Sequence, residues 1–180
     1  SLLEEVVLRE LRRREEKGDL RPMKEYHAQA DSLYNKRFSS ELREVEFEKH
    51  HKRLFMDFGF GETIEEAFAN AALATFRVMS TQKVNKSVKK QVSVTAHDYQ
   101  GLLYSFLEEF LFLLDTKNFF LSTLKVSIQE KDDVLFLRAE AFGDNAKKYE
   151  THTYVKAVTY HEMFIEKEKE KCVIQVVLDV

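Results

Sequence analysis

Hydrophobic residues recur at helical spacing in two stretches of the chain. The first stretch follows Thr63 and Glu66, which form a capping box of the kind that starts a helix. The second follows Asp98, a residue type favoured at helix N-caps. We therefore expect amphipathic helices over residues 63–79 and 98–114. Their apolar stripes are Ile64, Ala67, Phe68, Ala71, Ala72, Phe76 and Met79, and Leu102, Leu103, Phe106, Leu107, Phe110, Leu111 and Leu114.

Other stretches have the alternation or the composition of β-strands. They cover residues 54–60, 88–96, 124–128, 135–141, 155–163 and 172–180. Elements therefore follow one another as strand, helix, strand, helix and then a run of strands. This order predicts an α+β fold, a two-layer sandwich with two helices on one face of a mostly antiparallel sheet.

Residues 1–50 differ from the rest of the chain. They are rich in charge, and apolar residues within 1–21 fall at helical spacing before Pro22. Residues 39–41 (SSE) have the composition of a second helix start. We expect residues 1–50 to be a charged, partly helical extension, either a mobile arm or a partner-binding helix, and residues 51–180 to be the folded domain.

Composition limits the class of protein. With 28 Lys and Arg against 31 Asp and Glu, the net charge is −3, which argues against direct, tight binding of nucleic acid. No apolar run is long enough to cross a membrane, so we expect no membrane partner and a cytoplasmic protein, or a nuclear one in a eukaryote. The single cysteine, Cys172, has no partner for an internal disulfide.

Candidate chemistry concentrates in the strand over residues 155–163. Side chains alternate in direction along a strand, so His161 shares a face with Val155 and Met163, whereas Lys156 and Tyr160 share the opposite face. We expect His161 to be a hydrogen-bonded structural histidine on the more apolar face. Lys156 is either a surface lysine or a group that binds an anion or a carboxylate.

The last strand ends in a second polar position. Asp179 and the main chain of Val180 could supply oxygen ligands to calcium or magnesium. A solvated strand end would explain Asp179 equally well. Spaced Cys and His residues of the kind that hold structural zinc are missing from the sequence.

Four segments together resemble the archeases, small proteins that assist a tRNA-splicing RNA ligase. They are residues 155–163 (VKAVTYHEM), the closing residues 178–180 (LDV), the helix start at residues 61–68 (GETIEEAF) and the helix over residues 102–114. The resemblance extends from about residue 51 to residue 180. It implies a two-layer α/β fold and a protein cofactor that is not itself an enzyme. Such a cofactor activates an RtcB-type RNA ligase by promoting its guanylylation and turnover.

The resemblance also implies site residues. Lys156, His161 and His51 are the candidate functional residues, and calcium is the implied metal, held by Asp179 and the carbonyl of Val180. The family has a further aspartate in a His-Thr-Ala-Asp motif, which falls on residues 51–54 when counted back from Gly61. That aspartate is Leu54 in this chain, so we expect calcium binding to be weak or absent.

Two other interpretations remain open at this stage. One is a diverged module with the archease fold that binds another protein and has lost the metal-linked role. The other is a small hydrolase that uses Lys156, His161 and Asp179, although strand alternation places the first two on opposite faces.

Overall fold

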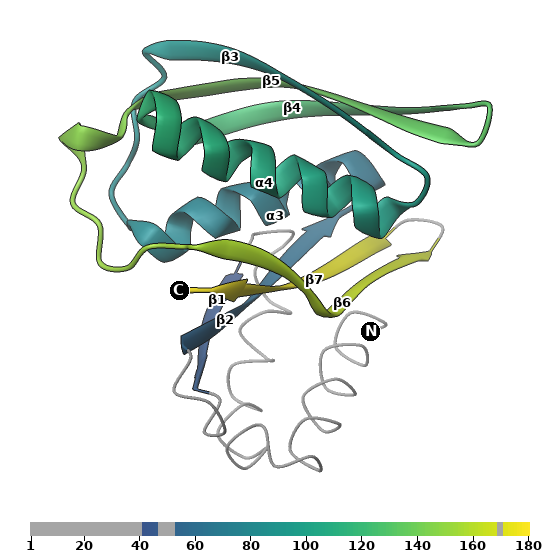
Figure 1. The fold of residues 1–180 in the computed structure, drawn as a ribbon, viewed down its shortest axis with the longest axis horizontal. Coiled ribbons are helices and arrows are strands. Elements are labelled where there is room, and N and C mark those ends of the chain that lie inside the picture. The colour runs from purple at the N-terminus through teal and green to yellow at the C-terminus, as the bar shows by residue number, and fades with distance from the viewer. Residues whose placement is uncertain (1–40, 47–52, 169–170) are drawn as a thin grey trace.

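A computed structural model describes residues 41–46, 53–168 and 171–180 of the chain, and the features below belong to these ranges. Helices α3 and α4 and seven strands lie within them (Figure 1). Their bounds are β1 Glu41–Glu46, β2 Arg53–Gly61, α3 Ile64–Met79, β3 Val88–Ala96, α4 Tyr99–Lys117, β4 Phe119–Lys131, β5 Val134–Asn145, β6 Ala157–Glu168 and β7 Lys171–Asp179.

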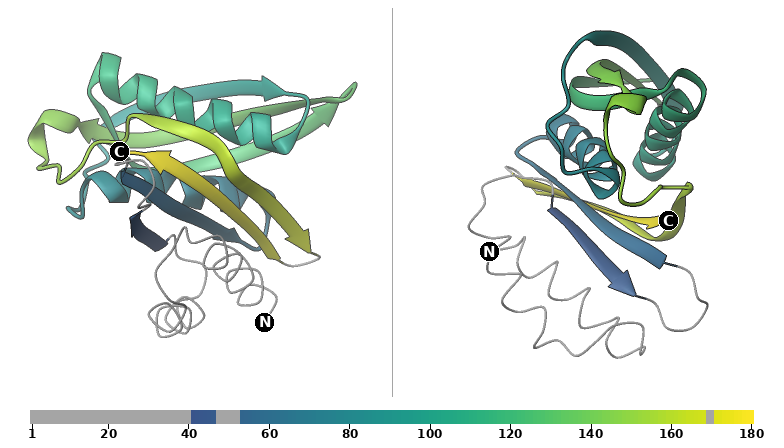
Figure 2. Two further views of the ribbon diagram at one scale, coloured as in Figure 1. Left: turned by 60° about the horizontal axis from the view of Figure 1, so that its bottom comes forward. Right: turned by 90° about the vertical axis from the view of Figure 1, so that its left-hand side faces the viewer.

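The strands form two antiparallel sheets that share the two helices. One sheet has the order β1-β2-β7-β6 and the other has the order β3-β5-β4. Helix α3 contacts β2 and β7 of the first sheet and β4 of the second, and α4 contacts β6 as well as β3 and β4. Figures 1 and 2 show the helices lying between the two sheets.

The α+β class, the two helices and the antiparallel pairing agree with the expectation from sequence. The structure adds that the strands divide into two sheets rather than forming one. The cause lies in α3, which is buried around most of its circumference, so one sheet cannot cover it. Its buried residues are Ile64, Ala67, Phe68, Ala71, Ala72, Ala74, Thr75, Phe76, Val78 and Met79.

Both helices begin at the expected N-caps. The hydroxyl oxygen of Thr63 accepts a hydrogen bond from the Glu66 amide at 3.2 Å, and Glu66 Oε2 accepts one from the Glu62 amide at 2.9 Å. Asp98 Oδ1 accepts from the Gly101 amide at 2.6 Å. These bonds satisfy amide groups that the first helical turn leaves without a partner.

Aromatic rings join the two helices to each other and to the three-stranded sheet. The Phe76 ring lies edge-on to Phe110 of α4, with centroids 6.2 Å apart, and to Phe120 of β4 at 5.2 Å. Phe106 contacts both Phe68 at 6.1 Å and Phe110 at 5.1 Å. This cluster forms the centre of the core, and its members are fully buried or nearly so.

Strand β2 passes very close to α3. A Cβ atom at Gly59 would collide with the carbonyl oxygen of Ala67 and would lie 2.9 Å from the Cβ of Ala71. Only glycine opposite alanine permits this approach, which explains the small residues on both elements.

One buried carboxylate anchors the loop that leads from β5 to β6. Asp144 is 2% exposed and accepts hydrogen bonds from Lys148 Nζ at 2.9 Å, the Tyr149 hydroxyl at 2.9 Å and the Asn145 amide at 2.8 Å. The Lys148 hydrogen bond, followed by that of the Asn145 amide, lowers the pKa of Asp144 from 3.8 to about 2. The Tyr149 oxygen also accepts from the Asn85 amide at 2.9 Å, which fastens the loop to the segment before β3.

The N-terminal expectations have mixed outcomes. Residues 41–46 form strand β1, which pairs with β2, so the interpretation of residues 39–41 as a helix start is wrong. The helix expected within residues 1–21 lies outside the described residues.

Substitution of Leu111 tests the position of the core. Leu111 is 5% exposed on α4, so Leu111→Ala leaves a cavity and should lower the free energy of unfolding by about 2–5 kcal/mol. The neighbouring Phe112 is 55% exposed, and Phe112→Ala should change it by less than about 0.5 kcal/mol. Urea unfolding of both variants measures the difference, and equal effects would place the core elsewhere.

Acid stability tests the Asp144 cluster. Because the folded-state pKa of Asp144 is depressed, its ionised form stabilises the fold above pH 4, and this contribution is lost as the pH falls toward 2. The difference in unfolding free energy between the unmodified chain and Asp144→Asn should therefore be largest above pH 4 and shrink below it. Urea unfolding at several pH values measures this difference. A difference that is constant across this range would show that the carboxylate is not held in its ionised form.

Candidate functional site

Lys156 lies immediately before β6 and contacts the closing residues of the chain twice. Its amide donates to the Asp179 carbonyl at 2.8 Å, and its ammonium Nζ donates to the main-chain oxygen of Val180 at 2.9 Å. The next residue, Ala157, is the register partner of Asp179 in the β6–β7 ladder. Figure 2 shows the C-terminus beside the segment that enters β6. We call Lys156, Asp179 and Val180 the Lys156 site.

Helix α4 holds β6 through a row of polar side chains. Gln100 Nε2 donates to the Met163 carbonyl at 3.1 Å, and Glu108 Oε1 accepts from the Val158 amide at 2.8 Å. Between these two bonds, the rings of Tyr104 and Tyr160 stack with centroids 4.4 Å apart. Because β6 is the outer strand of its sheet, Glu108 supplies a partner to an amide that points away from β7.

A fourth contact continues this row toward the Lys156 site. The Tyr154 hydroxyl donates to Asp115 Oδ1, in the last turn of α4. Residues 100, 104, 108 and 115 are spaced by four, four and seven positions, so they lie on one side of the helix. Sequence reasoning missed them, although this polar spacing within an otherwise apolar helix was the available signal.

The position of His161 differs from the expectation. The β6–β7 register shifts between Thr159 and Phe164, and Glu162 has a left-handed backbone with φ of 52°. This bulge breaks the alternation of side chains, so the His161 side chain is 59% exposed whereas Met163 is 7% exposed. The interpretation of His161 as a structural histidine on the apolar face is therefore wrong.

The candidates for a hydrolytic site are not brought together. His161 lies four residues beyond Ala157, the partner of Asp179, which corresponds to about 13 Å along a strand. The charged neighbour of His161 is Glu162, whose Oε1 lies 3.9 Å from His161 Nε2. Cys172 is buried, and burial raises the pKa of its thiol to about 11, which disfavours the reactive thiolate form. His51 lies outside the described residues.

The donor set at the Lys156 site does not fit calcium, which takes six to eight oxygen ligands. Leu54 of β2 is the register partner of Asp179, and its side chain offers no oxygen. The Val180 oxygen already accepts a hydrogen bond from the Lys156 ammonium, a cation that would repel a metal ion. In the described part of the chain, no three His, Cys, Asp or Glu side chains gather as a metal-binding group.

Two exposed tyrosines flank the Lys156 site. Tyr154 is 47% exposed and Tyr160 is 56% exposed, and both rings are fixed by contacts to α4.

Neither described helix is long and apolar enough to cross a membrane.

Comparison with known proteins identifies the family. The chain matches the model of the Archease protein family (MTH1598/TM1083) over residues 58–180. It is 43% identical to the protein archease of Pyrococcus furiosus over 112 residues, which are 61% of this chain and 79% of that protein. It is also 43% identical to the archease of Methanothermobacter thermautotrophicus over 122 residues, which are 67% of this chain and 87% of that protein.

A solved structure agrees with this assignment. The solution structure of Methanobacterium thermoautotrophicum protein 1598 superimposes with a TM-score of 0.65 and 36% sequence identity. The superposition covers 79% of this chain and 99% of the other. The residues that match the family model, 58–180, include β6 and β7, which meet at the Lys156 site, and helix α4, which supports it. This chain belongs to the archease family.

Proposed function

We propose that this archease activates an RtcB-type tRNA-splicing RNA ligase as a protein cofactor, promoting guanylylation of the ligase and its repeated turnover. The observation that supports this most directly is the double contact of Lys156 with the closing residues of the chain. These contacts hold an exposed ammonium group in one place beside Asp179 and Val180. A fixed cation at the rim of a domain is suited to recognising a carboxylate or phosphate on a partner.

Exposed aromatic side chains around the Lys156 site support a protein as that partner. Tyrosine is enriched in protein–protein interfaces, where a fixed ring buries apolar area at little entropic cost. The Tyr160 ring is held by stacking on Tyr104, and Tyr154 is held by Asp115. The two tyrosines and Lys156 could therefore contact the ligase together.

The separation of potential catalytic groups supports a cofactor rather than an enzyme. His161 is displaced along β6 from Asp179, and the Cys172 thiol is buried. In this proposal the ligase performs the chemistry, and this chain contributes binding contacts.

A second candidate is an archease-fold module that binds a protein but has lost the metal-linked role. The observation that favours it is Leu54 at the register position opposite Asp179. Stimulation of ligation without added calcium would favour activation by contact alone, whereas binding of the ligase without stimulation would favour this second candidate.

Replacement of Lys156 tests the proposed role. Lys156 is exposed, so Lys156→Ala should change the free energy of unfolding by less than about 0.5 kcal/mol. It should nevertheless reduce stimulation of a cognate RNA ligase strongly, because the partner loses the fixed ammonium group. Multiple-turnover ligation and guanylylation of the ligase are the two measurements.

Lys167→Ala is the matched control, since Lys167 is an exposed lysine near the far end of β6, the strand that follows Lys156. It should stimulate ligation like the unmodified chain. Full stimulation by a folded Lys156→Ala chain would remove Lys156 from the functional surface.

Calorimetry tests the metal. We propose that the unmodified chain binds calcium weakly or not at all, because the position opposite Asp179 carries no oxygen. Leu54→Asp should strengthen binding, and Leu54→Asn, which adds an oxygen without a charge, should strengthen it less. Tight binding by the unmodified chain that disappears in Asp179→Ala would show that another group replaces the family's aspartate.

A further inference from the structure

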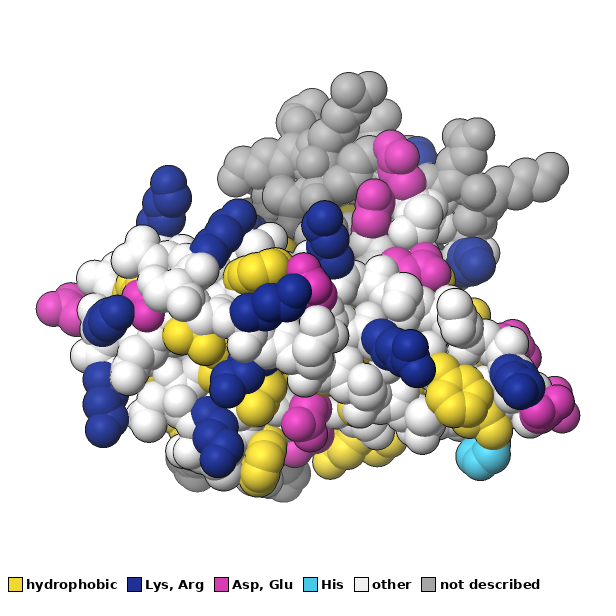
Figure 3. Space-filling model, turned by 90° about the horizontal axis from the view of Figure 1, so that it is seen from above, with side chains coloured by type: hydrophobic (Ala, Val, Ile, Leu, Met, Phe, Trp, Pro, Cys, Tyr) yellow, Lys and Arg dark blue, Asp and Glu magenta, His cyan; other side chains and the backbone are white. Residues whose placement is uncertain are grey.

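The three-stranded sheet has a face that points away from both helices. Figure 3 looks down on this side of the molecule and shows Lys and Arg side chains spread over it, with hydrophobic side chains between them. Exposed and buried positions alternate along β5, so its outward residues are Phe136, Arg138, Glu140 and Phe142. We call this surface the outer sheet face.

Cations outnumber anions on the outer sheet face. Lys89 of β3 and Lys125 of β4 flank the central strand, where they are register partners of Phe142 and Glu140. The single acid of β5 on this face, Glu140, is paired with Lys89 at 2.6 Å, and that bond lowers the pKa of the carboxyl. Lys125 and Arg138 therefore give the middle of the face a net positive charge.

Two aromatic rings lie among these cations. Phe136 is 42% exposed, and Phe142 is half-buried with Lys89 Nζ 5.6 Å from its ring centroid. The two residues are six positions apart on one strand, which corresponds to about 20 Å. Sheet surfaces that carry aromatic rings between basic side chains bind single-stranded nucleic acid, because bases stack on the rings and phosphates pair with the cations.

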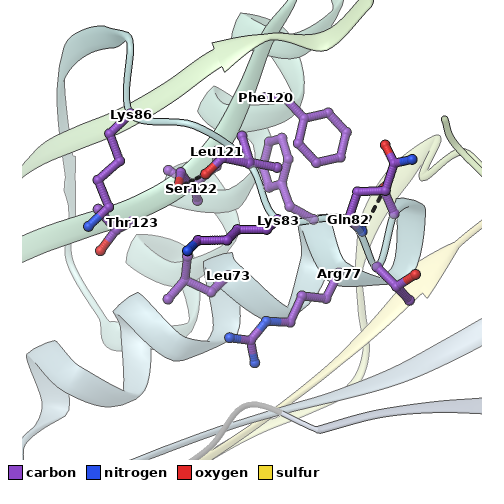
Figure 4. A pocket seen from close by; sticks show the side chains of 13 residues that line it. Leu73, Arg77, Gln82, Lys83, Lys86, Phe120, Leu121, Ser122 and Thr123 are labelled. Atoms are coloured by element: carbon purple, nitrogen blue, oxygen red, sulfur yellow. Dashed lines mark hydrogen bonds between the residues drawn. The ribbon is translucent and has the colours of Figure 1, made fainter. Parts of the chain in front are cut away.

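A basic pocket adjoins one end of the outer sheet face. It is a cavity of about 660 Å³, and among the residues that the structure describes its charged lining consists of Arg77, Lys83 and Lys86. Figure 4 shows these side chains around the opening together with Ser122 and Thr123. Thr123 is also the register partner of Phe142, so the pocket and the face are continuous.

We propose that the outer sheet face and the adjoining pocket bind single-stranded RNA. A base stacks on the exposed Phe136 ring, Arg138 and Lys125 contact phosphates beside it, Lys89 over the Phe142 ring adds a further cation, and the pocket receives another phosphate. The polar neighbours of Phe136 in the register, Thr95 and Gln129, can bond the 2′-hydroxyl that distinguishes RNA from DNA. This binding does not depend on the proposed activation of a ligase.

The overall charge of −3 limits the strength of such binding but does not oppose it. Screening at physiological salt confines the influence of each charge to about 8 Å, so the net charge of the whole chain does not set the local potential of one face. A single-stranded RNA that lies on the outer sheet face therefore meets the local positive charge of that face.

Fluorescence anisotropy of a fluorescein-labelled oligouridine with the full chain tests the proposal. The RNA should bind, and Phe136→Ala should weaken binding about fivefold or more, because it removes one stacking platform. Phe112→Ala is the matched control, since it removes another exposed ring, 55% exposed against 42% for Phe136, from α4, and it should leave RNA binding unchanged. Phe136→Leu keeps the apolar side chain without the ring and should weaken binding as Phe136→Ala does.

The salt dependence of RNA affinity tests whether the pocket binds a phosphate. Lys86→Gln should reduce the slope of log affinity against log salt by about 0.7, the value for one phosphate contact with a single strand. Lys167→Gln, in the other sheet, should leave the slope unchanged. The proposal would be overturned if the chain did not bind the RNA, or if Phe112→Ala weakened RNA binding as much as Phe136→Ala. It would also be overturned if the chain bound the matching oligodeoxyuridine as tightly as the oligouridine. A loss of ligase binding, rather than RNA binding, in Phe136→Ala would overturn it too, because the face would then contact a protein.

Discussion

The arrangement of the domain depends on one constraint: two apolar helices must be covered by two sheets at the same time. Helix α3 buries residues around most of its surface, including Ala67 toward β2 and Phe76 toward β4. The close approach at Gly59 holds one sheet against the helix, and the Phe76, Phe110 and Phe120 rings hold the other. The three-stranded sheet thus has one face in the core and one exposed face, whereas β7 of the four-stranded sheet is buried on both faces, with Val173, Gln175 and Val177 at 0% exposure. The exposed groups of the four-stranded sheet therefore lie at its β6 edge, away from the outer sheet face.

The Lys156 site is a consequence of how the edge of the four-stranded sheet is closed. An outer strand leaves every second amide without a partner, and such an edge invites pairing with other chains. Here Glu108, Gln100 and Asp115 of α4 supply side-chain contacts to β6 and the segment before it. Asp115 also fixes Tyr154 at the surface, and stacking on Tyr104 fixes Tyr160. The edge is thus protected from indiscriminate pairing while specific side chains remain exposed.

Sequence patterns predicted the elements well because their causes are local. The N-caps at Thr63 and Asp98 and the stripes that follow them depend on residues within one or two turns. Strand β1 was missed because its strand state depends on pairing with β2 rather than on its own composition. The division into two sheets was missed for a related reason, since a helical stripe shows how much is buried but not which strands cover it.

The candidate site shows the same limit at the level of single residues. Alternation assigned His161 to the more apolar face, but the irregularity after Thr159 turns it to solvent. There β6 advances five positions while β7 advances two, and alternation alone does not anticipate such extra residues in one strand. The contact between Lys156 and Val180 joins positions 24 residues apart, and only the pairing of β6 with β7 brings them together.

The outer sheet face and the Lys156 site differ in the charged residues that they carry. The outer sheet face and its pocket gather cations, with Glu140 neutralised by Lys89, although the chain as a whole is acidic. The Lys156 site instead combines one fixed cation with tyrosines and the closing Asp179. A net charge averages over both surfaces and therefore describes neither. In a protein whose two sheets are separated by its helices, a protein partner and an RNA strand could be bound on different sides without competing for the same residues.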